Sequence, residues 1–196
     1  MYRIATLILL GFSLFASPVH AKTLDPAGKI RPDLLERAVA ALDTRDGDSL
    51  DSGKLVLVDY SLHSSKERLF VLDLETGDVT AFRTAHGKGS DQDHDGYLDS
   101  FSDVPGSSAS PEGLYRAAEE YHGAHGLSLR LDGLTPTNAN ARSRAIVIHS
   151  AEYAEPDHLK KYGKLGRSNG CIVFSSADLA GFLEKVPKGT PIFVGK

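Results

Sequence analysis

Cys171, the only cysteine in this 196-residue chain, is the residue best suited to covalent chemistry. It follows Gly166-Arg167-Ser168-Asn169-Gly170, whose composition is typical of a tight turn, and it precedes the β-type run Ile172-Val173-Phe174. Such a turn would hold a thiol at the mouth of a sheet. It would also leave backbone N–H groups near Gly170 and Cys171 unpaired and able to stabilise an oxyanion. The alternative is a buried structural cysteine, the usual state of a lone free thiol.

His149 is the strongest candidate for a base that would generate the thiolate, the reactive form of a cysteine. It ends the apolar run Ala145-Ile146-Val147-Ile148 and precedes Ser150. It lies 22 residues before Cys171, so only folding can bring the two side chains together. For any single one of the eight histidines, a structural role is the alternative.

The segment Asp91-Gln92-Asp93-His94-Asp95-Gly96 has the pattern of the first half of an EF-hand calcium loop. Asp91, Asp93 and Asp95 would supply the oxygens. Position 12 of the pattern is Ser102, where an EF-hand needs a glutamate, so the alternative is a solvated acidic loop that orders the rim of the site. The histidine spacing matches no zinc motif, and we expect no cofactor other than this possible calcium.

The elements that must position these residues are mostly β. Apolar spacing predicts helices over Ile30 to Thr44 and Ser176 to Val186. Strands are predicted by β-rich runs at Lys54 to Tyr60, Arg68 to Leu74, Val79 to Thr84, Leu127 to Leu131, Ala145 to His149, Ile172 to Phe174 and Pro191 to Val194. From His86 to Glu112 the chain reads as a loop, and a loop of that length favours a functional role.

Composition and the N-terminal residues restrict the class of protein and its location. The chain has 22 Lys and Arg against 26 Asp and Glu, a net charge of −4, which argues against a nucleic-acid binder. Arg3, the apolar run Ile4 to Ala16 and Val19-His20-Ala21 predict a signal peptide over residues 1–21 and a periplasmic location. Residues 22–52 are then a helical extension and residues 53–196 a catalytic domain. No membrane span is expected in the mature chain, which we expect to be a monomer.

The pairing of Ile148-His149-Ser150 with Ser168-Asn169-Gly170-Cys171 resembles the signature of L,D-transpeptidases of the YkuD type. The segment Ser110-Pro111-Glu112-Gly113-Leu114-Tyr115 is similar to that family's Thr-Pro-x-Gly-x-aromatic strand. Three further segments resemble the murein L,D-transpeptidase catalytic-domain branch of the family: His86-Gly87-Lys88-Gly89-Ser90, Phe101 to Ser107 and His125-Gly126-Leu127-Ser128-Leu129. The resemblance runs from about Leu55 to the C-terminus. It implies a β-sandwich-like fold with mixed sheets and a few peripheral helices.

The chain departs from the commoner form of this signature at two places. Asn169 stands where a histidine is usual, and no arginine follows Cys171. Arg167 is the candidate to supply the missing positive charge from the other side of the turn. These departures affect how substrate carboxylates are held.

The resemblance implies that Cys171 attacks a peptidoglycan tetrapeptide stem, releases D-Ala and holds the stem as a thioester. His149 would activate the thiol, its other ring nitrogen being oriented by an acceptor such as a backbone carbonyl. An amine of a second stem or water would then accept the stem. Gly170, Asn169 and Ser150 are candidate oxyanion or orienting residues. Candidate substrate-binding residues are Arg167, Ser168, His86 and Tyr115, the last being a core aromatic in the alternative interpretation.

Two other functions stay open. A purely hydrolytic L,D-carboxypeptidase would share the donor chemistry. A non-catalytic or calcium-stabilised wall-binding module would have an unreactive Cys171. A papain-like wall peptidase is disfavoured, because in those enzymes the cysteine precedes the histidine in the chain.

Overall fold

The computed structural model describes residues 24–43 and 53–196, so the predicted signal peptide lies outside the described residues. The helices are α1 (Pro32–Asp43), α2 (Pro156–Tyr162) and α3 (Ser176–Leu183). The strands are β1 (Lys54–Asp59), β2 (Glu67–Asp73), β3 (Val79–Arg83), β4 (Gly113–Gly123), β5 (Gly126–Gly133), β6 (Val147–Ser150), β7 (Ile172–Phe174) and β8 (Pro191–Gly195).

The strands form one mixed sheet in the order β3-β2-β1-β8-β4-β5-β6-β7. The β1–β8 and β6–β7 pairs are parallel, and the other neighbours are antiparallel. The two edges of the sheet approach each other, because Ala85, just after β3, forms an antiparallel bridge with Val173 of β7. The rings of Phe82 and Phe174 also meet, with centroids 6.0 Å apart. The sheet therefore folds over on itself, which confirms the predicted β-sandwich-like architecture.

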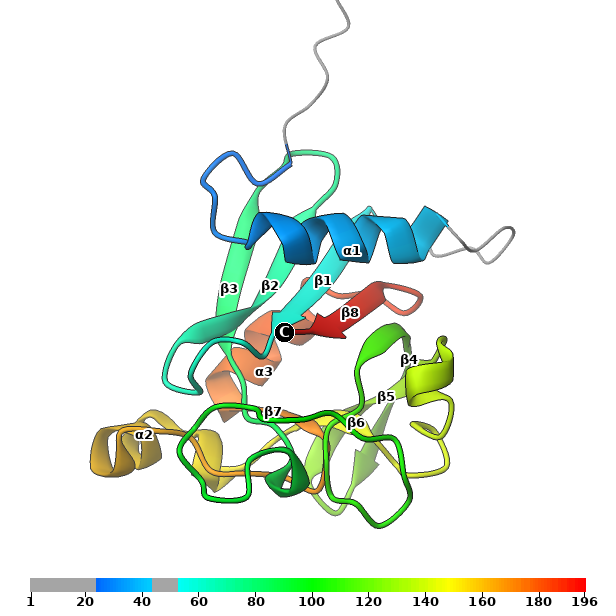
Figure 1. Ribbon diagram of the computed structural model, residues 1–196. Coiled ribbons are helices and arrows are strands. Elements are labelled where there is room, and N and C mark those ends of the chain that lie inside the picture. Colours follow the sequence, from blue (N-terminus) through cyan, green and yellow to red (C-terminus); the bar gives the residue numbers. More distant parts are fainter. Residues whose placement is uncertain (1–23, 44–52) are drawn as a thin grey trace, which may run out of the picture.

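Both faces of β1 are buried, which explains its unbroken apolar sequence. Leu55 and Leu57 pack in the cluster that contains Leu34 and Ala38 of α1. Val56 and Val58 point the other way, into the larger cluster between the two halves of the sheet. Figure 1 shows α1 lying across β1 and β2, far from α2. In this way α1 covers one face of the sheet and α3 contributes to the core on the other.

Two elements were missed by the sequence patterns. β4 extends for 11 residues, but its alternation is broken by a register irregularity between Ala117 and Glu120. α2 is a short, polar helix with no buried residue, so it has no apolar stripe to reveal it. β6 also begins two residues later than predicted, because Ala145 has a φ of 54°, a left-handed conformation that ends a strand.

Between β3 and β4 the chain makes the long loop predicted from Gly, Ser, Asp and Pro content. The loop contains one 3-10 turn, Lys88–Ser90, and it pairs with the segment before β7: Gly87 forms a parallel bridge with Ser168. Among the described residues, no helix combines the length and the apolar character needed to cross a bilayer.

Candidate active site

The parallel pair β6–β7 brings His149 and Cys171 to the same face of the sheet. Ile148 lies opposite Ile172 and His149 opposite Val173. Ile148 and Ile172 point into the main core. Because side chains alternate along a strand, His149 and Cys171 both lie on the opposite face. The fold thus puts the two residues that the sequence selected on the same face of neighbouring segments.

His149 is buried, with 2% of its surface exposed, and its ring is fixed by two contacts. Nδ1 lies 2.9 Å from the carbonyl oxygen of Ser150. Since a carbonyl only accepts, Nδ1 carries the proton and Nε2 keeps its lone pair. The ring of His125 stacks on the His149 ring at a centroid distance of 4.2 Å. Burial lowers the pKa of His149, and the neighbouring His125 lowers it further against the raising effect of the Ser150 carbonyl.

Cys171 is half-buried, and burial raises the pKa of its thiol. Two groups oppose that effect: the Val147 N–H, which bonds to the sulfur, and the positive charge of Arg144. Sγ lies 3.6 Å from the carbonyl oxygen of Ala145, to which it donates. A thiol with a raised pKa needs a base to react at neutral pH, and the unprotonated Nε2 of His149 is a basic atom on the same face.

The turn before Cys171 is held by its own side chains and backbone. Ser168 is buried, and its Oγ donates to the Cys171 carbonyl at 2.8 Å and accepts from the Gly170 N–H at 3.0 Å. The prediction of an unpaired Gly170 amide is therefore wrong. The prediction that Ser168 binds substrate is also corrected, because its hydroxyl is used within the turn. Gly170 is required here, since its φ is 121° and a Cβ would lie 2.6 Å from the Ala109 carbonyl oxygen.

Arg144 is a functional candidate that the sequence analysis missed. Its side chain is only 5% exposed. It donates to the carbonyls of Ser102 and Ala109 at 2.8 Å each, and Nη2 lies 3.3 Å from the position of a Cβ on Gly170. The positive charge near Cys171 therefore comes from Arg144. Its place directly before the predicted strand Ala145 to His149 gave no signal, because a solvated surface arginine has the same sequence context.

Arg167, proposed for that role, is half-buried and donates to the backbone carbonyl of Asp91. It ties the cysteine turn to the acidic loop. Asn169 is exposed at the tip of the turn, and its oxyanion or orienting role stays a prediction.

His86 does not line a substrate groove, which corrects its predicted role. It is 1% exposed and lies between Arg68 and Asp91. Nη2 of Arg68 is 2.8 Å from Nδ1 of His86, and Nε2 of His86 is 3.0 Å from Oδ2 of Asp91. Because guanidinium only donates, Nδ1 accepts and Nε2 carries the proton. Burial lowers the pKa of His86 to about 4, with the charge of Arg68 as the next cause, and the ring is neutral at pH 7.

This buried network supports the cysteine turn from behind. The backbone of His86 accepts from the Ser168 N–H at 2.8 Å, and the Lys88 N–H donates to the Ser168 carbonyl at the same distance. Arg68 is fully buried, also donates to the carbonyls of Thr84 and Leu62, and lies over the Tyr60 ring. Its burial lowers its pKa to about 10.

Tyr115 is likewise a core residue and not a substrate contact. It is 1% exposed, and its hydroxyl donates to the Pro111 carbonyl at 2.8 Å. The aromatic residue beside the thiol is instead Tyr153, which packs with Cys171 against Ala85 and Val173. Burial, and then the neighbouring Cys171, raise the pKa of Tyr153 to about 12. Gly166 leaves room for this ring, because a Cβ there would lie 2.5 Å from Tyr153 Cβ.

Backbone N–H groups of the acidic loop donate to a carboxylate of the same loop. Asp91 is fully buried and accepts from the N–H groups of Asp95 and Gly96 as well as from His86. Ligand atoms of Asp91, Asp93 and Asp99 lie within 4.8 Å of one another. Asp95, a predicted ligand, is not part of this cluster, and Asp99 was not predicted. Calcium binding by the loop stays a prediction.

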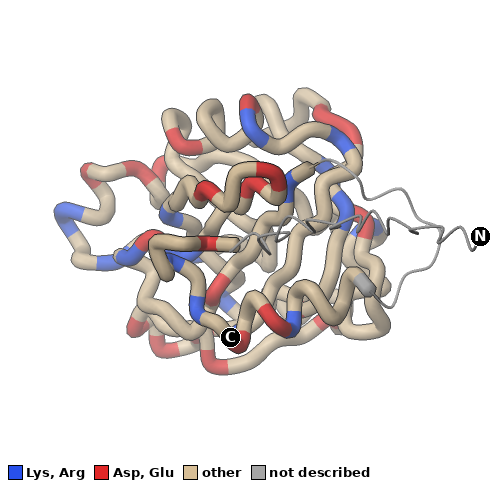
Figure 2. The backbone as a smooth tube through the Cα atoms, turned by 90° about the horizontal axis from the view of Figure 1, so that it is seen from above, with Lys and Arg blue, Asp and Glu red and all other residues tan. Residues whose placement is uncertain are grey.

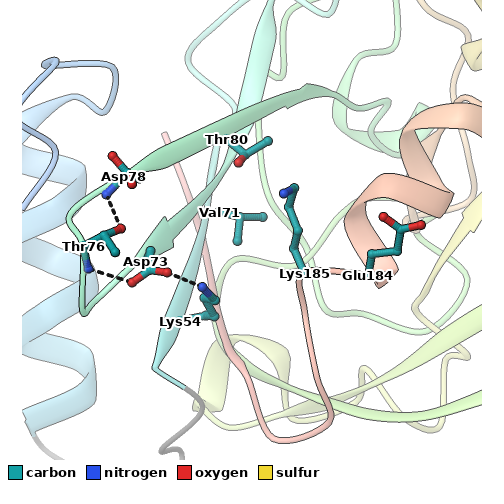
Figure 3. A pocket seen from close by; sticks show the side chains of 8 residues that line it. All are labelled: Lys54, Val71, Asp73, Thr76, Asp78, Thr80, Glu184 and Lys185. Carbon is teal, nitrogen blue, oxygen red and sulfur yellow. Dashed lines mark hydrogen bonds and ion pairs between the residues drawn. The ribbon is translucent and has the colours of Figure 1, made fainter.

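A cleft of about 400 Å³ lies away from this site, between the β2–β3 hairpin and the segment after α3 (Figure 3). Lys54 and Asp73 form an ion pair on its wall. The cleft lies near Thr80, at the start of β3, whereas the cysteine turn meets the chain beyond the end of that strand. In the view of Figure 2, basic and acidic positions are interspersed along the backbone. Neither Cys171 nor His149 lines this cleft, so the cleft is separate from the β6–β7 site.

The fold and the site define a mostly β protein with a thiol and a basic imidazole on one face of adjacent parallel strands. The sequence model of the L,D-transpeptidase catalytic domain matches residues 26–194, and the chain belongs to that family. The match includes α1, which the sequence analysis assigned to an N-terminal extension.

Solved structures with a similar chain course include an L,D-transpeptidase from Mycobacterium smegmatis, with 18% identity and a TM-score of 0.45, covering 74% of this chain and 59% of that one. L,D-transpeptidase 3 from Mycobacterium tuberculosis has 16% identity and a TM-score of 0.46, with 74% and 61% covered. The chain thus spans less than two thirds of the length of these proteins. No curated protein sequence matches it.

Proposed function

We propose that this protein is an exported peptidoglycan L,D-transpeptidase in which Cys171 is the nucleophile and His149 the base. The observation that carries the proposal is the shared face of β6 and β7, on which a buried imidazole with a free Nε2 accompanies the single thiol. Membership of the L,D-transpeptidase catalytic domain family supports the substrate class, a tetrapeptide stem.

In the first half-reaction, Nε2 of His149 removes the thiol proton and Sγ forms a bond to the carbonyl carbon of the third stem residue. The bond from that carbon to the nitrogen of the terminal D-Ala breaks, and the proton on Nε2 moves to the leaving amine. The thiol rotates from the Ala145 carbonyl toward the imidazole for this step. The product is a stem thioester on Cys171.

In the second half-reaction, an amine of another stem attacks the thioester carbonyl, His149 takes its proton, and the Cys171 thiolate leaves. Water in place of the amine would give a tripeptide, the product of an L,D-carboxypeptidase. The Cys171 N–H is the amide of the turn that we assign to the oxyanion, because the Gly170 N–H is bonded to Ser168. Arg144 adds positive charge beside the sulfur.

Intact-protein mass spectrometry with purified tetrapeptide muropeptides tests the chemistry. We expect an adduct of one stem minus D-Ala on the wild-type protein, free D-Ala in solution, and neither with Cys171→Ala. Far-UV circular dichroism of the variant should match the wild type. A variant that still releases D-Ala would refute Cys171 as nucleophile. The second product, a cross-linked dimer or a tripeptide, separates transpeptidase from carboxypeptidase.

Export is the remaining part of the proposal. The charged N-terminal segment, the apolar run and the small residues that end at Ala21 support cleavage after that position and a periplasmic location. Mass spectrometry of protein recovered from the periplasmic fraction should show a chain that begins at Lys22. Recovery of the uncleaved chain from the cytoplasm would contradict this part.

A further inference from the structure

His125 makes a contact that nothing in the proposed mechanism requires. Its ring lies 4.2 Å from the His149 ring, at an interplanar angle of 18°. His149 is buried, whereas His125 is exposed. The face of the proposed base is therefore covered by a side chain that itself remains in contact with water.

The β4–β5 hairpin fixes the position of His125. Gly123 pairs with Gly126, so Ala124 and His125 form a two-residue turn. Gly126 has a φ of 75°, a conformation that suits glycine and lets the chain reverse there. Leu129 pairs with Ile148, which places the start of β5 beside the end of β6. Backbone pairing of β4 with β5, and of β5 with β6, thus holds this turn beside His149.

The stacked ring completes the restraint on His149. The Ser150 carbonyl fixes the edge of the ring at Nδ1, and this bond alone still permits the plane to tilt. A parallel ring at 4.2 Å opposes such tilting and keeps water from that face. Burial and the charge of His125 both disfavour the protonated form of His149, and His125 is the titratable side chain that acts on it electrostatically among the described residues.

We propose that His125 is a positioning residue for His149: its stacked ring holds the base in the plane in which Nε2 faces the thiol and shields it from water. The inference rests on the proposed function for its catalytic consequence. The stacking itself is independent of that function, and the two can be tested separately.

NMR titration of the His149 ring protons tests the contact in the whole protein. In His125→Ala, we expect the pKa of His149 to rise and its resonances to move downfield, because the cover and the ring current are lost. His125→Phe keeps a stacked ring without a charge, so it should retain the upfield resonances and part of the lowered pKa. The matched control is His122→Ala, which removes an exposed histidine three residues away in the same hairpin. In this variant the His149 ring should titrate as it does in the wild type.

The same variants test the catalytic consequence through D-Ala release. We expect His125→Ala to slow release about tenfold, part of the 10²- to 10⁴-fold that a positioned acid–base group supplies, and His125→Phe to recover most of the loss. Unchanged His149 resonances and pKa in His125→Ala would overturn the proposal. A phenylalanine variant as slow as the alanine variant would also overturn it, since the imidazole itself would then be needed. If the wild type releases no D-Ala, the proposed function fails, while the NMR titration still decides the stacking.

Discussion

Replacement of Arg68 by methionine probes the buried network behind the cysteine turn. The guanidinium donates to the Thr84 carbonyl, the Leu62 carbonyl and the His86 ring at 2.8 to 2.9 Å. Methionine fills much of the same volume but donates nothing, so two buried acceptors and the part-buried Leu62 carbonyl lose their partner. Each such loss costs about 1 to 3 kcal/mol, and removal of the buried charge offsets part of the sum. We expect the free energy of unfolding to fall by about 4 kcal/mol, as found when a buried polar partner is deleted.

Urea denaturation at pH 7, followed by circular dichroism, measures this loss. For a domain of this size, about 4 kcal/mol corresponds to a decrease in Tm of roughly 8 to 16 °C. Arg142→Met is the matched control, because Arg142 is 47% exposed and pairs with Glu119 and Asp132 at the surface. That variant should lose no more than about 1 kcal/mol. If both variants lost equal stability, Arg68 would not hold the network as described.

Three substitutions and one pH series test the rest of the site. His149→Ala should slow alkylation of Cys171 near pH 7, because the base is lost, and should move the midpoint of alkylation against pH toward the raised pKa that burial gives the thiol, as followed by mass spectrometry. Arg144→Gln alone should raise the pH midpoint of Cys171 alkylation, because a positive charge that favours the thiolate is lost. Gly170→Ala should lower Tm and alkylation rate together, since its Cβ would meet the Ala109 carbonyl at 2.6 Å. Stability should fall by about 3 kcal/mol between pH 6.5 and pH 4, because the unfolded chain binds a proton that folded His86, with its pKa of about 4, excludes. If the free energy of unfolding in urea were the same at pH 6.5 and pH 4, the predicted role of His86 would be refuted.

Local sequence predicted the elements well where the hydrophobic pattern was simple. The observed ranges of β1, β2, β3, β7, β8 and the two longer helices are close to the expected ones. The strands are short β-rich runs, and the helices have apolar residues at helical spacing. The pattern failed for β4, where an irregular register interrupts the alternation, and for α2, which buries nothing.

The candidate site, too, could be predicted only in part. Cys171 and His149 were accessible to sequence reasoning, since a single thiol beside a turn and a histidine that ends a strand are local features. Burial is not local: His86 and Tyr115 lie in the interior because distant strands cover them, and no nearby residue indicates this. Arg144 was missed for the same reason. Its significance comes from the loop it binds, about 40 residues earlier in the chain.

The distribution of charge around the cysteine turn explains why so few residues are left for chemistry. Arg144 is nearly buried and donates to two backbone carbonyls, to the Asp103 carboxylate and to the Ser107 hydroxyl. Arg68 is fully buried and donates to two backbone carbonyls and to the His86 ring. The carboxylate of Asp91 accepts hydrogen bonds from His86 and from two N–H groups of its own loop. Such groups hold the turn rigid but cannot exchange protons with a substrate. The titratable side chains left on this face include the thiol of Cys171, the stacked pair His149 and His125, and Tyr153, whose pKa of about 12 keeps its hydroxyl protonated at pH 7. A thioester mechanism needs no more than a nucleophile and one base that is held in place.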